Sequence, residues 1–273
     1  MFGLASPGLR RKMPGKETLL ITDQIRRIAE DENIAVLGIE AASEMANECP
    51  GHRPEDLLPG AQSLICFGIP VPREVYRMPT CGAETVWRSQ NLYYRRLDTL
   101  SLRFASLLEG SGEGAIPIYG CMPLDMTEKG VVVGYLNQIR MGEVTGIGAV
   151  GKNGLLLHSL YGSRLMLGGV LTTAVLPKMR FPDVDQSACP SDCRICEDVC
   201  PVQAIMADKK QLDIMRCLAY TARTPFMSRT KFFFLRAFNP RVAARYMSLT
   251  SFDEHTFHTC SRCVALCPYG EGK

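Results

Sequence analysis

The sequence predicts an α+β fold in two parts, an α/β domain over residues 17–178 and a small cysteine-rich domain over residues 179–273. Three observations carry this prediction. Amphipathic helical patterns alternate with short apolar runs through the first part, a glycine-rich segment lies near residue 150, and eight of the twelve cysteines follow residue 188. Residues 1–16 are basic but contain no long apolar run, so we expect a flexible tail there rather than a signal peptide.

The beginning of the α/β part shows one helix and two strands. Apolar residues at helical spacing predict an amphipathic helix that begins near Thr18. The apolar run at 34–39 predicts a buried strand, and a loop rich in proline and glycine follows at 49–60. A second apolar run, at 63–69, predicts another buried strand.

The rest of this part continues the alternation. The spacing of apolar residues predicts an amphipathic helix from Tyr93 to Glu109, and a short strand is expected at 116–119. We interpret residues 131–144 as helical.

Two further apolar runs, at 155–157 and 164–173, predict a hairpin around the turn at 161–163. Residues 177–185 are then expected to form the linker to the cysteine-rich domain.

Composition limits the classes of partner. Hydrophobic residues make up 46% and charged residues 22%, which is ordinary for a globular protein. The net charge of +3 predicts neither a nucleic-acid partner nor an anionic membrane. Since no stretch approaches 18 uncharged apolar residues, we expect no transmembrane helix and place the protein in the reducing cytoplasm.

Two cysteine runs carry the strongest signal in the chain. The first is Cys189-Pro-Ser-Asp-Cys193-Arg-Ile-Cys196-Glu-Asp-Val-Cys200-Pro201, and the second joins an isolated Cys217 to Cys260-Ser-Arg-Cys263-Val-Ala-Leu-Cys267-Pro268. Each run contains C-x2-C-x3-C-P, the ending of the two-cluster ferredoxin run, in which the last cysteine ligates the other cluster. Eight thiolates at four per cluster therefore predict two [4Fe-4S] clusters and an electron-transfer role.

The same spacing predicts how the thiols pair. We expect one cluster on Cys189, Cys193, Cys196 and Cys267. We expect the other on Cys200, Cys217, Cys260 and Cys263. Cys189 departs from the usual run because C-x3-C separates it from Cys193.

Two structural alternatives explain the cysteines less well. Paired C-x2-C units also hold structural zinc, but the interleaved C-x3-C-P endings argue against it. Disulfides do not suit a chain without secretory features. The remaining cysteines lack ligand spacing, and Cys66 in its apolar run is expected to be a small buried residue.

The glycine-rich segment at 145–154 requires tight turns or close approach of the backbone to a ligand. It fits neither G-x-G-x-x-G before a helix nor G-x-x-x-x-G-K-[ST], because a strand follows and Asn153 follows Lys152. A nucleotide loop is therefore not expected.

Three passages occur together in one known family. Residues 53–60 match R-P-x-x-L-L-P-G, residues 146–157 are similar to G-L-G-W-x-G-K-x-x-L-x-L, and the cysteine framework completes the set. By these passages the sequence resembles the superfamily of epoxyqueuosine reductases and reductive dehalogenases, which are iron–sulfur proteins. The resemblance covers most of the chain from about residue 52 onward.

The resemblance implies a nitroreductase-like α/β domain that holds base-off cobalamin, followed by a ferredoxin-like domain with two [4Fe-4S] clusters. Electrons would pass from the nearer cluster to the corrinoid, which would reduce a small substrate. The backbone of Gly146, Gly148 and Gly151, together with Lys152, would line the corrinoid pocket. Folds of this kind also hold flavin, which is the alternative organic cofactor.

The sequence departs from the family at the catalytic acid. Gly120 occupies the place of the aspartate of epoxyqueuosine reductases, Ala149 replaces a tryptophan of the glycine loop, and the helical-repeat extension of some members does not follow Lys273. We therefore expect a substrate other than tRNA. Tyr119, beside Gly120, is the first candidate for a substitute proton donor.

Other polar residues near that position are weaker candidates. Asp125 and Glu143 are interpreted as structural or exposed, and His158 as a histidine at a strand end rather than a cobalt ligand.

Between Cys217 and Cys260 lies a segment rich in aromatic and basic residues, 218–259. One interpretation is a docking surface for an acidic electron donor, a membrane surface or nucleic acid. The favoured interpretation is an amphipathic helix that covers the clusters with its arginines in water.

Three hypotheses about function follow. The first is a cytoplasmic iron–sulfur reductase with a corrinoid, fed by a donor such as ferredoxin or flavodoxin and acting on a small molecule or a protein redox partner. The second is a non-catalytic electron carrier or activator, which Gly120 favours. The third is a flavin-dependent reductase of the same fold.

Overall fold

The computed structural model describes residues 15–79, 82–120, 124–126, 132–182, 189–223, 226–249, 257–258 and 260–270. The predicted tail therefore lies outside the described residues, apart from Gly15 and Lys16. Helices and strands both contribute, so the expected mixed α+β class is confirmed.

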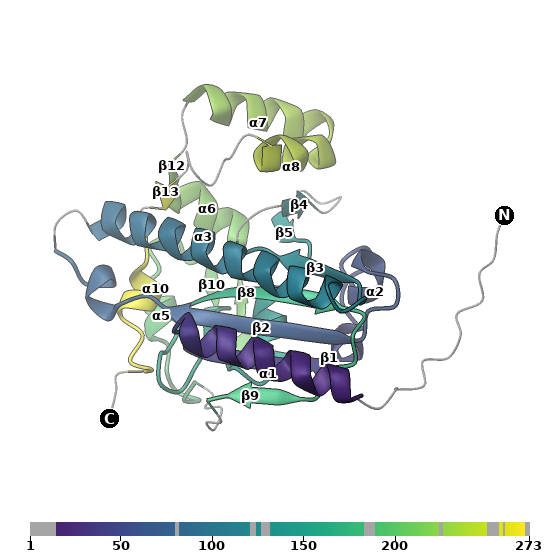
Figure 1. Ribbon diagram of the computed structural model, residues 1–273. Coiled ribbons are helices and arrows are strands. Elements are labelled where there is room, and N and C mark those ends of the chain that lie inside the picture. The colour runs from purple at the N-terminus through teal and green to yellow at the C-terminus, as the bar shows by residue number, and fades with distance from the viewer. Residues whose placement is uncertain are drawn as a thin grey trace.

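A five-stranded antiparallel sheet forms the centre of the first part, in the order β3-β8-β2-β1-β9 (Figure 1). The strands are β1 (Val36–Ala41), β2 (Ser63–Pro70), β3 (Ala115–Ile118), β8 (Leu165–Thr172) and β9 (Met179–Phe181). Apolar runs predict four of these strands, whereas β9 lies in the segment 177–185 that is expected to be a linker, so that expectation is wrong for residues 179–181. Because β9 pairs with β1, the sheet extends three residues past the boundary expected at residue 178.

Two helices cover one face of this sheet, α1 (Lys16–Asp31) and α3 (Gly82–Glu109) (Figure 1). Helix α3 begins eleven residues before the expected start at Tyr93. Alternate residues of β2, Ile65, Phe67 and Ile69, face these helices, which is the period-two pattern of a strand. The ring of Phe67 meets that of Phe104 edge-on, with centroids 5.2 Å apart.

The other face of the sheet carries α4 (Gln138–Val144), which occupies only the end of the segment expected to be helical at 131–144. A glycine in β1 lets α4 end close to the sheet, because a Cβ at Gly38 would lie 2.6 Å from the carbonyl oxygen of Thr145. A Cβ at Gly169 in β8 would likewise collide with the Met141 side chain. This close packing holds the glycine loop that follows α4 against the sheet.

The predicted hairpin of 155–157 with 164–173 is wrong. Strand β7 (Leu156–Leu157) pairs with β6 (Ala149–Val150) of the glycine loop, whereas β8 pairs with β2 and β3. A run of apolar residues cannot specify its partner, and the long β8 completes more hydrogen bonds inside the large sheet than beside a two-residue strand. A second short pair, β4 (Leu124–Met126) with β5 (Val132–Gly134), lies next to α8.

The remaining small elements are short turns of 3-10 or α-helix. In the first part these are η1 (Ala42–Met45), α2 (Pro54–Leu57) and η2 (Arg73–Tyr76).

The cysteine-rich part is built from short elements. Helices α5 (Ile195–Asp198), α6 (Ile214–Thr221) and α10 (Arg262–Ala265) carry or flank the cysteines. Two small strand pairs lie among them, β10 (Ile205–Met206) with β11 (Gln211–Leu212), and β12 (Ala222–Arg223) with β13 (Phe257–His258); η3 (Ala207–Lys209) connects the first pair. Helix α10 packs on η2, and Val264 and Ala265 join the apolar cluster beneath α3.

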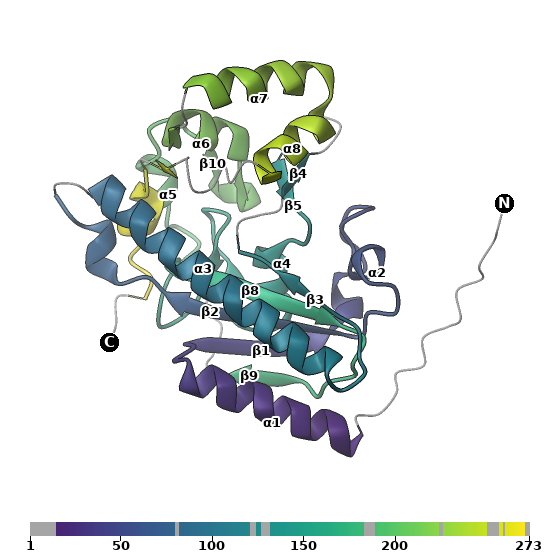
Figure 2. The ribbon, with the colours of Figure 1, turned by 45° about the horizontal axis from the view of Figure 1, so that its top comes forward.

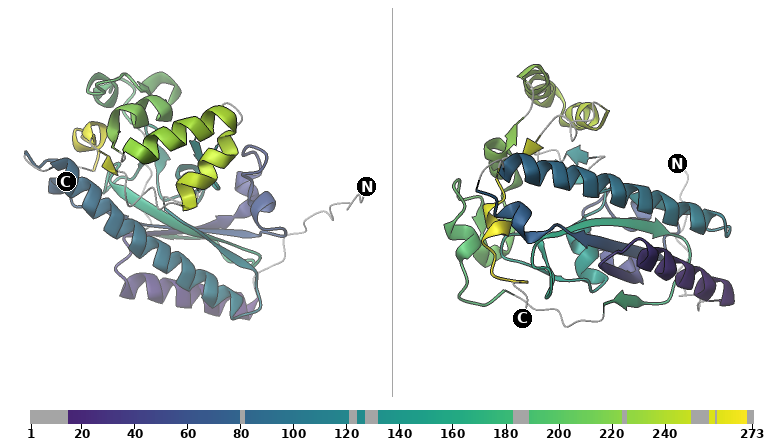
Figure 3. Two further views of the ribbon diagram at one scale, coloured as in Figure 1. Left: turned by 90° about the horizontal axis from the view of Figure 1, so that it is seen from above. Right: turned by 60° about the vertical axis from the view of Figure 1, so that its left-hand side comes forward.

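The aromatic and basic segment forms two helices, α7 (Phe226–Phe238) and α8 (Pro240–Leu249), which pack on each other and stand above α3 and the sheet (Figure 3). Three of its phenylalanines are largely exposed, Phe233 at 55%, Phe234 at 64% and Phe238 at 76%. These three rings face solvent. The favoured interpretation, an amphipathic helix whose apolar side covers the clusters, is therefore wrong for these phenylalanines. Its other, less exposed side contains Phe232, Leu235 and Arg236.

In the part of the chain that the structure describes, we find no helix both long and apolar enough to span a bilayer.

The Phe67–Phe104 contact gives a test of the core. Replacement of Phe104, whose side chain is 0% exposed, by alanine is expected to lower the free energy of unfolding by about 3–5 kcal/mol, because it removes apolar contacts and leaves a cavity. Leu102→Ala, on the same helix but 50% exposed, is the control and should change it by less than about 0.5 kcal/mol. Urea unfolding followed by circular dichroism measures both; equal shifts would contradict this packing.

Candidate metal centre

Two short helices in contact bring the cysteine runs together, α5 and α10 (Figures 1 and 2). Cys196 lies within α5 with Cys200 just after it, and Cys263 lies within α10 with Cys267 just after it. Each helix ends before the second of these cysteines, so Cys200 and Cys267 lie beyond the helical turn that carries Cys196 or Cys263. Cys217 comes from α6.

Electrostatic interactions identify the neighbours of the first group of thiols. Burial raises the pKa of Cys196 to about 11, and Cys189, Cys193 and Cys267 raise it further. Burial also raises the pKa of Cys267, with Cys189 and Cys193 acting in the same direction. Thiolates repel one another, so such shifts mark thiols that face each other. We call Cys189, Cys193, Cys196 and Cys267 the first thiol set.

The second group follows in the same way. Burial raises the pKa of Cys217, and Cys260 and Cys200 add to the rise. Burial raises the pKa of Cys263 to about 12, with contributions from Cys217, Cys260, Cys196 and Cys200. We call Cys200, Cys217, Cys260 and Cys263 the second thiol set. The interaction between Cys263 and Cys196 shows that the two sets adjoin.

These neighbours are the ones that the interleaved pairing requires, and the pairing itself stays a prediction. Among the described residues, no three side chains of histidine, cysteine, aspartate or glutamate are close enough to hold a single metal ion. The sets are therefore defined by electrostatic proximity and not by a closed coordination sphere.

A cavity that is partly open to solvent, about 360 Å³ with the open solvent space at its mouth included, lies at the first thiol set. All four thiol-bearing residues line it, including Cys189, whose spacing was irregular. The opposite wall comes from the glycine loop and β7, through Lys152, Asn153 and Leu157. The α/β part therefore closes one side of the first thiol set.

Lys152 joins the glycine loop to the cysteine segment. Its ammonium donates hydrogen bonds to the carbonyl oxygens of Ser191, at 2.7 Å, and Cys193, at 2.8 Å. Its backbone N–H points to the Cys189 sulfur at 3.4 Å. These contacts hold the loop that carries the first two thiols of the set.

The three glycines expected to line a corrinoid pocket are buried against protein. Gly146 has φ +79°, and a Cβ there would collide with the Arg180 guanidinium. A Cβ at Gly148 would lie 2.6 Å from the Leu157 carbonyl oxygen, and one at Gly151 would lie 2.9 Å from the Asn153 side chain. The loop thus needs glycine in order to pack on its own hairpin and, at Gly151, beside Cys189.

Gly120 stands where the resemblance implies a catalytic aspartate, and a side chain of α3 occupies the adjacent space. A Cβ at Gly120 would collide with the Tyr94 ring and lie 3.0 Å from the Leu167 carbonyl oxygen. The Gly120 backbone N–H donates to Asp98 Oδ1 at 2.9 Å. Tyr94 and Asp98 are four residues apart on one helix face, a spacing that could have singled them out, but sequence reasoning considered only the apolar residues of α3.

The other candidates have structural contacts. Tyr119 is half-buried, and its carbonyl oxygen accepts a hydrogen bond from the Gln138 side chain. Glu143 forms an ion pair with Arg140. The side chain of Asp125 lies outside the described residues.

His158 has the contacts of a buried structural residue. Burial lowers its pKa to about 4, so the ring is neutral near pH 7, and its Nδ1 accepts a hydrogen bond from the Leu160 N–H. It stacks on Tyr161, which agrees with its interpretation as a histidine at a strand end.

The contact at Gly120 gives a second prediction. Gly120→Ala should lower stability by about 1–3 kcal/mol, because the new methyl group overlaps the Tyr94 ring. In a Tyr94→Ala background the same substitution should cost far less, a non-additivity that a double-mutant cycle measures.

Gly15→Ala is the matched control, since a Cβ there meets nothing within 4 Å. Additive effects of the Gly120 and Tyr94 substitutions on the midpoint of thermal unfolding would show that the ring does not fill this space.

Comparison with known proteins gives relatives of one kind. No protein-family model matches the chain. An epoxyqueuosine reductase of Bacillus cereus is 27% identical over 230 residues, which cover 80% of this chain and 51% of the relative. The curated relatives that match most of this chain are about twice as long as the matched part, so the chain spans about half the length of these relatives.

Solved structures show the same fold. The epoxyqueuosine reductase from Streptococcus thermophilus superposes with a TM-score of 0.55 at 20% identity and covers 93% of this chain and 67% of that one. An epoxyqueuosine reductase with a tRNA stem loop gives 0.54 at 18% identity, covering 94% and 67%. A reductive dehalogenase described as B12-dependent gives 0.52 at 15% identity, covering 92% and 38%. The resemblance inferred from the three sequence passages, to epoxyqueuosine reductases and reductive dehalogenases, is therefore confirmed.

Proposed function

We propose that this chain is an iron–sulfur oxidoreductase that carries two [4Fe-4S] clusters, one on each thiol set. The observation that carries the proposal is the convergence of the four thiol-bearing residues of the first set on one cavity, with the second set adjoining it. When bound, such clusters supply one-electron transfer. The relatives named as reductases support the same class of reaction.

The environment of the thiols suits metal binding. Burial and mutual repulsion disfavour the free thiolates of Cys196 and Cys263, so the positive charge of bound iron would offset both effects. In the first set the protein adds the Lys152 hydrogen bonds, which fix the loop of Cys189 and Cys193. The residues of the two sets thus fit the clusters.

The direction of electron flow follows from which set faces the α/β part. The first thiol set lies against the glycine loop and β7, so we infer that electrons leave the cysteine-rich part at this set. The second set is then the entry point. A ferredoxin or flavodoxin is the proposed donor, because the relevant partner needs a low-potential one-electron centre.

The fit to a corrinoid at the glycine loop is poor. Gly146, Gly148 and Gly151 pack against protein groups, and Lys152 is hydrogen-bonded to the cysteine segment. These four residues therefore support the first thiol set in our proposal. A corrinoid or a flavin elsewhere in the α/β part remains a proposal that direct binding measurements test.

A second candidate function is electron transfer without an organic cofactor. The observation that favours it is the Tyr94 ring in the space where a side chain at residue 120 would lie. If the protein is a reductase instead, we propose Tyr119 or Asp98 as the proton donor, because Asp98 contacts the Gly120 backbone and Tyr119 is its neighbour. A tRNA stem loop, bound by one structural neighbour, is a substrate to test beside small molecules.

Composition of the purified protein separates these functions. Anaerobic protein should contain about eight irons and eight sulfides per chain, for two clusters of four irons each. One tightly bound corrinoid, present on purification or acquired from added cobalamin, supports the corrinoid reductase, and bound flavin supports the flavin enzyme. Iron without either cofactor leaves electron transfer, and one or two zinc ions without sulfide would refute the cluster proposal.

The pairing of the thiols predicts which substitutions act alike. Cys200→Ser and Cys263→Ser should each damage the cluster of the second thiol set and spare the other. Cys196→Ser should damage the cluster of the first set, although Cys196 and Cys200 are only four residues apart. Electron paramagnetic resonance of the reduced variants distinguishes the two signals. Loss of the same signal in Cys196→Ser and Cys200→Ser would rule out the interleaved pairing.

The role of Lys152 predicts selective loss of iron. Lys152→Met keeps the length of the side chain but removes the hydrogen bonds to the carbonyls of Ser191 and Cys193, so iron at the first set should be released severalfold faster to a chelator. Lys209→Met, an exposed lysine of η3, is the matched control. Release at the wild-type rate from both variants would show that Lys152 does not support this set.

A further inference from the structure

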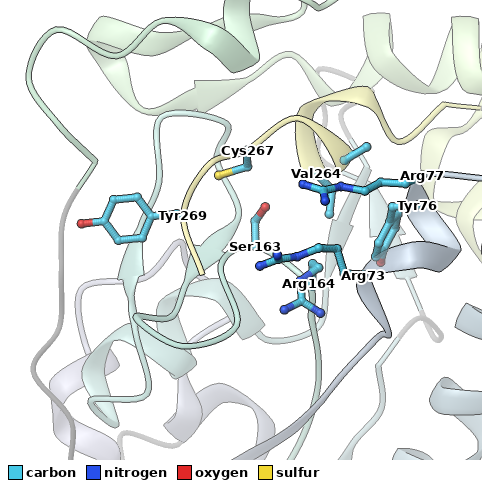
Figure 4. A pocket seen from close by; sticks show the side chains of 9 residues that line it. Arg73, Tyr76, Arg77, Ser163, Arg164, Val264, Cys267 and Tyr269 are labelled. Carbon is cyan, nitrogen blue, oxygen red and sulfur yellow. The ribbon is translucent and has the colours of Figure 1, made fainter. Parts of the chain in front are cut away.

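A second cavity, distinct from the one at the first thiol set, lies where α10 meets η2 and the turn before β8 (Figure 4). It is a shallow hollow that measures about 250 Å³ only when the open solvent space at its mouth is included. The residues on which its chemistry depends are Arg73, Tyr76, Arg77, Ser163, Arg164 and Cys267. They come from both parts of the chain, so the cavity exists only in the folded whole.

Three guanidinium groups line this cavity. Figure 4 shows Arg73 and Arg164 side by side, with Arg77 above them. Arg164 donates to the Val71 carbonyl oxygen at 2.7 Å and Arg73 to that of Gly270. Arg77 lies 4.0 Å from Glu74, whose carboxylate is 83% exposed. Among the described residues that line the cavity there is no carboxylate.

Bringing these cations together is unfavourable. Burial lowers the pKa of Arg164, and Arg73 and Arg77 lower it further. Like charges at short range in a partly buried site repel, since little water screens them. A negative group in the cavity would turn this repulsion into attraction for all three arginines.

A hydroxyl group completes the polar lining. Ser163 is 6% exposed, and among the described residues its Oγ has no hydrogen-bond partner of normal geometry, although a hydrogen bond toward Cys267 lowers the pKa of that thiol. In Figure 4 it lies between Arg73 and Cys267. A serine hydroxyl can donate to an oxygen atom, so this buried group offers a fourth donor on the same cavity.

We propose that Arg73, Arg77, Arg164 and Ser163 form a binding site for a small oxyanion, either a phosphate or a carboxylate group. Guanidinium groups bind both through paired, charge-assisted hydrogen bonds. The hollow opens to solvent, so an oxyanion can approach the guanidinium groups at its mouth. This site lies beside the proposed electron path, and binding does not require the clusters to have the composition proposed above.

The site also borders the first thiol set, because Cys267 lines both cavities. Negative charge beside a cluster disfavours the addition of an electron to it. If the proposed function holds, a bound oxyanion therefore makes the cluster of the first set harder to reduce. The anion site would then let the concentration of an acidic metabolite or an acidic partner group control electron flow.

Titration of the anaerobically purified protein with sodium phosphate and, separately, sodium acetate tests the site. Sodium chloride keeps the ionic strength constant, and the midpoint of thermal unfolding reports binding. Phosphate, acetate or both should raise the midpoint in a saturable way, and the arm that responds identifies the group. Arg164→Gln should weaken binding at least tenfold, as should Arg77→Gln, an exposed residue whose replacement disturbs folding least.

Arg26→Gln is the matched control, since Arg26 is exposed on α1 and pairs along its own helix with Glu30. No saturable response to either anion, or equal loss in Arg26→Gln and Arg77→Gln, overturns the proposal. A reductive titration with and without the bound anion then measures the cluster potential. Anion binding that leaves this potential unchanged overturns the link to electron flow and leaves the binding site in place.

Discussion

The interleaving of two cysteine runs is the constraint on which the rest of this structure depends. In the interleaved pairing that we propose, the last thiol of each run belongs to the cluster of the other run, so neither run would complete a site alone. Helices α5 and α10, more than sixty residues apart in sequence, must therefore pack together. Helix α6 supplies the missing thiol of the second set. The chain between them is free to form α7 and α8, which stand apart from the sheet.

The α/β part then acts as a support for these small elements. Four-residue helices have too little apolar surface to be stable by themselves. Val264 and Ala265 of α10 pack into the apolar cluster beneath α3, and Lys152 holds the segment of Cys189 and Cys193. Gly38 of β1 and Gly169 of β8 contribute indirectly. They let α4 lie close to the sheet, and α4 in turn positions the glycine loop. The position of the cysteines therefore depends on the packing of the α/β core.

Charge is distributed unevenly around the first thiol set. One side meets the Lys152 ammonium, and the other borders the cavity with three arginines. Thiolate-bound iron–sulfur clusters carry net negative charge, so both sides would favour retention of the proposed cluster. The two sides differ in their partners, since Lys152 is hydrogen-bonded to backbone carbonyls whereas the arginines face a cavity open to solvent. This difference separates a structural contact from a binding site.

The sequence by itself determined the strands β1 and β2 and most of α1, because periodicity is a local property, and its ligand spacing predicts how the eight cysteines divide between two groups. It could not determine that β8 joins β2 and β3 while β7 pairs with β6, since an apolar run does not encode its partner. The tertiary structure alone placed Tyr94 at Gly120, Lys152 on the cysteine segment, and Arg164 beside Arg73 and Arg77. Each of these contacts joins residues at least 26 positions apart, and only the folding of the whole chain brings them within reach of one another.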